Sequence, residues 1–72
     1  MRDPAVHLAV LRRVVSDARE RGLAVLDALA SPILGPEGNR EFLIHVVVPP
    51  AGVGPKTLDR LADARLVTVT GG

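Results

Sequence analysis

The sequence predicts a small α/β domain built from one helix, an antiparallel pair of strands and a short α/β tail. Apolar residues recur at helical spacing over residues 4–21, and two apolar runs follow at residues 23–30 and 41–48. A loop rich in proline and glycine separates the two runs. A chain of 72 residues forms one domain at most, and a domain of this size buries its core only marginally.

The composition excludes several classes of protein. Hydrophobic residues make up 47% of the chain, which is too many for a disordered segment, and the absence of cysteine excludes disulfides and thiolate metal sites. A formal net charge of +1 provides no broad attraction for nucleic acid. We find neither a secretory leader pattern nor an apolar run near the roughly 20 residues that span a bilayer, so we expect a cytoplasmic protein without a membrane partner.

The helix predicted at residues 4–21 has clear signals at both ends. Asp3 is a favourable N-cap, and Pro4 suits the first helical position, where its missing N–H costs nothing. Arg19 and Arg21 place positive charge in the last turn, and Gly22 is a typical terminator. The apolar stripe consists of Val6, His7, Val10, Leu11, Val14, Val15 and Ala18.

His7 is the one polar residue on that stripe. It could act as a metal ligand or a general base, but no second histidine or carboxylate stands at ligand spacing. The only other histidine, His45, falls in the second apolar run. We therefore predict that His7 lies at the edge of the core.

Both apolar runs resemble strands from the interior of a sheet. In the first run, Leu23, Val25 and Leu29 are predicted on one face, and Ala24, Leu26, Ala28 and Ala30 on the other. Strands that are apolar on both faces belong in a sheet covered by helices on both sides. A connection of about ten residues favours antiparallel pairing. Because one strong helix cannot cover both faces, we expect an exposed apolar patch and self-association of the isolated chain.

The remainder of the chain is predicted as a linker and a tail. Residues 49–56 have the proline and glycine content of a linker, residues 57–64 fit a short helix capped by Thr57, and residues 65–70 alternate as a strand would. The glycines at 52 and 54 are no dinucleotide-binding fingerprint, because no third glycine follows and Pro55 occupies the point where a helix would open.

The loop over residues 31–42 carries the main candidate site. Glycine, asparagine and proline shape it, and Glu41 follows at the mouth of the second strand. Folds of the α/β class often present a catalytic carboxylate at such a position. Local chemistry alone favours an ordinary solvated residue at the strand end.

Two segments of the sequence resemble a known family. The segments are RDPAVH at residues 2–7 and SPILGPEGNREFL at residues 31–43, with the helix end at Gly22 between them. Over about residues 2–47 the chain is similar to the carboxy-terminal end of the TlyA (haemolysin A) family, which resembles FtsJ-type RNA methyltransferases. The resemblance implies an S4-type RNA-binding domain and a Rossmann-like methyltransferase domain in the complete protein.

The resemblance also implies an activity and a role for Glu41. Family members transfer a methyl group from S-adenosylmethionine to ribose 2′-hydroxyls of ribosomal RNA, using a Lys-Asp-Lys-Glu set. Glu41 matches the glutamate of that set, and the loop residues that shape its surroundings are Ser31, Pro32, Gly35, Pro36, Gly38 and Asn39. The other members of the set and the glycine-rich cofactor motif are missing, and Lys56 lies outside the matching region.

Two hypotheses follow. In the first, residues 1–48 are the carboxy-terminal segment of a Rossmann-like methyltransferase sheet, residues 49–56 a linker and residues 57–72 a divergent tail, and the chain alone binds no cofactor and is inactive. In the second, the chain is a small non-catalytic α/β interaction module. Its tail would then cover the strands with Leu58, Leu61, Leu66, Val67 and Val69.

Overall fold

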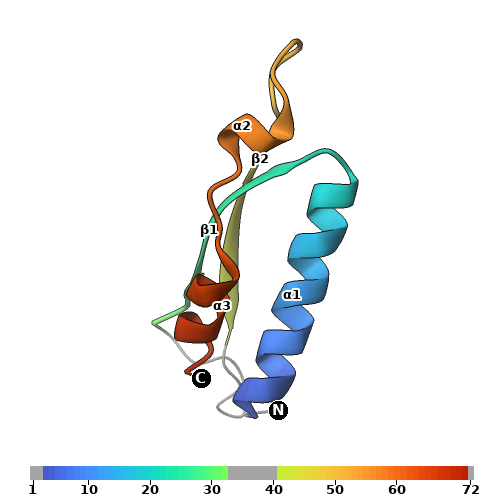
Figure 1. Cartoon of the computed structure of the whole chain (residues 1–72). Coiled ribbons are helices and arrows are strands. Elements are labelled where there is room, and N and C mark those ends of the chain that lie inside the picture. The colour runs from blue at the N-terminus through green and yellow to red at the C-terminus, as the bar shows by residue number, and fades with distance from the viewer. Residues whose placement is uncertain (1–2, 33–40, 72) are drawn as a thin grey trace.

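A computed structural model of the chain describes residues 3–32 and 41–71. Their order is a helix, two strands and two shorter helices (Figure 1). The elements are α1 (Pro4–Glu20), β1 (Ala24–Ala30), β2 (Phe42–Val47), α2 (Pro55–Leu58) and α3 (Asp63–Val69). This arrangement confirms the predicted mixed α/β class. No helix in the described residues is long and apolar enough to cross a membrane.

The helix α1 has the boundaries that its end signals predict. The Asp3 carboxylate accepts a hydrogen bond from the Ala5 N–H at 2.9 Å, which satisfies one of the unpaired donors at the helix start. Gly22 follows the helix with φ 81°, a conformation that glycine adopts without steric cost. Only one edge of the predicted stripe is buried, at Leu11 and Val15.

The strands β1 and β2 pair antiparallel, as predicted, but β1 is irregular near its start. Ala28 pairs with Ile44 and Val25 pairs with Val46, and the register shifts between Val25 and Asp27. In a regular strand, Val25 and Ala28 would lie on opposite faces. Both belong to the same buried cluster, so the predicted division of β1 into two faces is wrong.

The core lies on one face of the strand pair, between β1, α1 and α3. Its buried members are Leu11, Val15, Val25, Ala28, Leu61 and Leu66, and Phe42, Ile44 and Val69 pack against them. On the opposite face Leu29 and Leu43 are partners across the strand pair, and both remain exposed. Within residues 3–32 and 41–71 the sheet is therefore covered on one face, and Leu29 and Leu43 leave the other face bare.

The prediction for the tail is wrong in its secondary structure. The helix predicted at residues 57–64 ends at Leu58, and the strand predicted at residues 65–70 is the helix α3. Residues 59–61 are instead held against β1, because the Arg60 and Leu61 N–H groups donate to the Val25 carbonyl oxygen at 2.9 and 3.1 Å. These tertiary hydrogen bonds accompany an extended backbone at Asp59, which ends the predicted helix early.

The tail packs into the same core as the rest of the chain. Leu61 and Leu66 are buried, and Val69 packs against the cluster, which follows from the i, i+3 spacing of Leu66 and Val69 on α3. The segment between β2 and α2 contains a turn in which the Val53 N–H donates to the Pro50 carbonyl oxygen. The tail therefore adds to the cover on the face that α1 occupies, and Leu29 and Leu43 stay exposed on the other face.

Candidate functional site

The two ends of the candidate loop are joined by a backbone hydrogen bond at the end of the strand pair. The Ser31 N–H donates to the Glu41 carbonyl oxygen at 2.8 Å, which continues the antiparallel pairing one step beyond β1 and β2. Pro32 is exposed at the start of the loop. The predicted shaping residues Gly35, Pro36, Gly38 and Asn39 lie outside the described residues. The pairing brings Ser31 and Glu41 together across the base of the loop.

Glu41 is exposed and directly precedes β2, whereas the sequence predicts it as the first residue of that strand. Its neighbour Phe42 points into the core side of the sheet, where its ring meets the ring of His7 edge-on with 5.3 Å between centroids. His7 is half-buried, which confirms its predicted place at the edge of the core. The first residue of β2 thus contacts α1, and the exposed Glu41 lies next to this contact.

Lys56 does not reach Glu41. It lies in α2, which follows the far end of β2, whereas Glu41 precedes the near end (Figure 1). The resemblance implies lysines and an aspartate beside this glutamate, and no lysine lies beside Glu41 in the described residues. In the part of the chain that the structure describes, the candidate site consists of the exposed Glu41 carboxylate and the loop base beside it.

A cluster of hydrogen bonds around Asp59, the Asp59 node, joins α1, β1 and the tail, and the sequence does not indicate it. Arg19 donates to both Asp59 carboxylate oxygens, through Nε at 3.0 Å and Nη2 at 2.7 Å, and Nη2 also donates to the Leu61 carbonyl at 2.7 Å. The same carboxylate accepts the Val25 N–H at 2.9 Å. The partners stand about 40 positions apart, and no sequence pattern indicates such a pairing.

The Asp59 node should contribute measurably to stability. Asp59 is 17% exposed, so its ion pair is less screened than an exposed one. Asp59→Asn keeps the size of the side chain but removes its charge and one acceptor, and we expect unfolding free energy to fall by about 1–2 kcal/mol in urea denaturation. Asp63→Asn is the matched control, because Asp63 also pairs with an α1 arginine but is 58% exposed. Equal losses in both variants would contradict the role given to Asp59.

Acid should weaken the fold through this node. Hydrogen bonding from Arg19 and from the Val25 N–H lowers the pKa of Asp59 below its ordinary value. A carboxyl group with a lowered folded-state pKa stabilises fully above its unfolded value of about 3.9, and the contribution disappears as pH falls through the folded value. We expect the melting temperature to drop below about pH 4, and to drop less steeply in Asp59→Asn. Parallel curves for the two proteins would exclude Asp59 as the cause.

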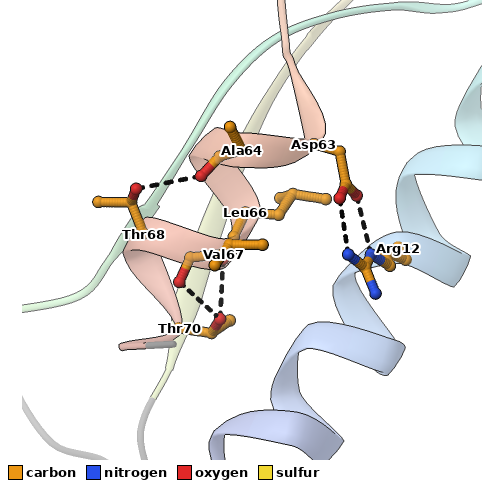
Figure 2. A network of polar contacts seen from close by, with 7 residues as sticks. All are labelled: Arg12, Asp63, Ala64, Leu66, Val67, Thr68 and Thr70. Carbon is orange, nitrogen blue, oxygen red and sulfur yellow. Dashed lines mark hydrogen bonds and ion pairs between the residues drawn. The ribbon is translucent and has the colours of Figure 1, made fainter.

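A second link between α1 and the tail lies at the start of α3. Arg12 donates to Asp63 through Nε at 2.8 Å and Nη2 at 2.6 Å, as Figure 2 shows. At the other end of α3, the Thr70 hydroxyl donates to the Leu66 carbonyl at 2.8 Å, which satisfies a buried hydroxyl and an end carbonyl together. The Arg12–Asp63 contact thus joins the start of α3 to α1, whereas the Thr70 contact caps the end of α3 itself.

An open groove of about 340 Å³ lies between α1 and α3. The charged groups at its walls include Arg12, Arg19 and Asp63, which already pair within the protein. The arginines and the aspartate of this groove are therefore engaged in ion pairs within the protein. The described residues contain no group of three or more histidine, cysteine or acidic residues that could hold a metal ion.

The segment between β2 and α2 differs from a glycine-rich cofactor-binding loop. The segment that passes from a strand through glycines to a helix runs from β2 to α2. Here α2 has four residues and begins with Pro55, so it lacks both the length and the first N–H of a helix that cradles an anionic group.

Comparison with known proteins gives one informative similarity. The chain is 42% identical over 52 residues to "Putative rRNA methyltransferase YqxC" of Bacillus subtilis (strain 168). The aligned region covers 72% of this chain and 18% of that relative, so the chain spans under a fifth of the relative's length. No protein-family model and no solved structure matches the chain.

Proposed function

We propose that the chain is a carboxy-terminal piece of an rRNA methyltransferase that uses S-adenosylmethionine to methylate ribose 2′-hydroxyls, and that it is inactive alone. The similarity over 52 residues to YqxC carries this proposal. The position of Glu41 supports it, because an exposed carboxylate at a rigid strand mouth suits a catalytic set completed by other chain segments.

Glu41 would act on a lysine of that set. A ribose hydroxyl is a weak nucleophile at neutral pH, so a neighbouring base must accept its proton. A carboxylate within a few ångströms of a lysine ammonium stabilises the charged form and fixes its position. The hydrogen bond between Ser31 and Glu41 holds the backbone from which that carboxylate projects. Ribosomal RNA is the partner of the complete enzyme.

A chimeric enzyme tests the proposal. In YqxC, the segment that aligns with this chain is replaced by the matching residues of this chain, and transfer of labelled methyl groups to ribosomal RNA is measured. We expect activity in the chimera and none in the isolated chain or in YqxC truncated before the segment. A stable chimera without activity, beside an active parent, would contradict the proposal.

A second candidate function rests on the packing of the tail. Leu61 and Leu66 complete the core on one face, which is what an independently folding interaction module requires. For such a module we expect a sharp cooperative melt of a dilute monomer. A broad, concentration-dependent transition would favour the fragment instead, since the bare face of the sheet promotes self-association.

A further inference from the structure

A second groove, which we name the α2 groove, lies between the last turn of α1, the start of β1 and α2. Its volume is about 510 Å³. The residues that line it are Arg19, Leu23, Gly54, Pro55, Lys56 and Asp59. Glu41 precedes the opposite end of β2, so the α2 groove is separate from the candidate catalytic residue (Figure 1).

Two of the three charged side chains in the α2 groove already pair with each other. Arg19 donates to both carboxylate oxygens of Asp59, and Asp59 also accepts the Val25 N–H. The third, Lys56, is exposed and makes no hydrogen bond or ion pair with residues 3–32 or 41–71. Because the charges of Arg19 and Asp59 cancel, the α2 groove carries one uncompensated positive charge.

Most of the remaining surface of the α2 groove is apolar. Leu23 and Pro55 are only half-buried there, so each keeps apolar area that a ligand can cover. Small-molecule sites are typically concave, with volumes of about 300–1,000 Å³, and combine an apolar lining with a few polar groups. The α2 groove has this size and this combination of surfaces.

We propose that the α2 groove binds a small aliphatic carboxylate, with its hydrocarbon chain against Leu23 and Pro55 and its carboxylate beside the Lys56 ammonium. One positive charge next to apolar surface complements one negative charge on an apolar body. The helix end does not supply the anion contact, because α2 has four residues and begins with Pro55, which has no N–H. The Lys56 side chain therefore selects for the negative charge.

Ligands of other charge fit the α2 groove less well. An amine would place a second positive charge beside Lys56, and the carboxylate of Asp59 is already engaged by Arg19 and Val25. A neutral alcohol would cover the apolar surface but leave the charge of Lys56 uncompensated. Affinity should therefore fall from carboxylate to alcohol to amine when the hydrocarbon chain is kept the same.

Titration of the isolated 72-residue chain with sodium hexanoate, followed by proton–nitrogen NMR at pH 7, tests the proposal. Lysine and carboxylate groups are both charged at this pH. We expect saturable changes in chemical shift at the Leu23, Gly54 and Lys56 amides, with a Kd of about 1 mM. The Thr70 amide at the end of α3 is the reference and should not move. Because the isolated chain is measured, the outcome does not depend on the proposed function.

Related ligands separate the contributions of charge and hydrocarbon. We expect hexanol to bind about threefold more weakly than hexanoate, and hexylamine more weakly still. Each buried methylene group strengthens binding by about threefold to fourfold, so butanoate should bind about tenfold more weakly than hexanoate. Equal binding of hexanoate and hexanol would overturn the assignment of an anionic ligand.

Substitution of Lys56 tests the source of the charge. Lys56→Gln should weaken hexanoate binding by about threefold, the modest loss expected for an exposed ion pair, and Lys56→Arg should restore it. Arg60→Gln is the matched control, because it also removes one positive charge from an exposed residue of the tail but lies outside the α2 groove. It should leave the affinity for hexanoate unchanged.

Three further results would overturn the proposal. The first is a titration without saturable shifts at Leu23, Gly54 and Lys56. The second is an equal loss of affinity in Lys56→Gln and Arg60→Gln, which would reflect net charge alone. The third is movement of the same amides when the protein is concentrated without hexanoate, which would identify a second copy of the chain as the occupant of the α2 groove.

Discussion

Leu66→Ala should lower the free energy of unfolding by about 2–4 kcal/mol, because it removes a buried side chain at the junction of α1, β1 and α3. Leu66 is 2% exposed, so the shortened side chain leaves a cavity that the surrounding helices cannot fully close. Small domains have total stabilities of about 5–15 kcal/mol, and the loss is a large fraction of that range. Urea denaturation followed by circular dichroism measures it.

The matched control is Leu43→Ala on the bare face of the sheet. The chemical change is the same, but Leu43 loses little burial because more than half of its side chain is exposed. We expect a loss well under about 1 kcal/mol in the isolated chain. If Leu66→Ala and Leu43→Ala cost the same, α3 does not pack in the core.

Glu41→Gln should slow methyl transfer by the chimera by about two to four orders of magnitude. The substitution keeps the size and much of the hydrogen-bonding capacity of the side chain but removes the charge that would hold a lysine ammonium. Because Glu41 is exposed, little change in stability is expected, and the effect should appear in the rate of the chemical step. Single-turnover transfer to ribosomal RNA separates this step from RNA binding.

Glu37→Gln is the control for that rate. Glu37 precedes Glu41 by four positions and belongs to the same loop, but it does not match the catalytic position of the family. We expect the Glu37 variant to react at nearly the original rate. Similar rates in the two variants would identify Glu41 as an ordinary residue at a strand end.

The helix and the strand pair could be predicted from the sequence because their signals are local. The boundaries of α1 follow from Asp3, Pro4 and Gly22, and antiparallel pairing follows from the short connection between two apolar runs. The irregularity in β1 could not be predicted, since it depends on contacts of Val25 with residues more than 30 positions away.

The tail shows how tertiary contacts can override a local pattern. The alternation over residues 65–70 fits a strand, but Leu66 and Val69 also have the spacing of a helix face, and burial against α1 and β1 favours the helix. Asp59 interrupts the predicted helix because its carboxylate pairs with Arg19 and Val25 instead. None of these partners is adjacent in sequence.

The sequence predicted the place of the candidate site better than its chemistry. The turn residues and the apolar run predict Glu41 at the junction of the loop and the second strand. In the structure it lies immediately before β2, and its carbonyl oxygen accepts the Ser31 N–H. Its catalytic role stays a prediction, because the resemblance assigns it through partners that this chain does not contain.

The most direct test of this account is the position of the methyl group in ribosomal RNA treated with the chimera. Digestion of the product to nucleosides, followed by mass spectrometry, distinguishes methylated ribose from methylated base. We predict a 2′-O-methylated nucleoside that requires both the grafted residues and the remainder of YqxC, and that decreases sharply with Glu41→Gln. Methylation on a base, or a 2′-O-methylated product at an unchanged level with Glu41→Gln, would contradict the account.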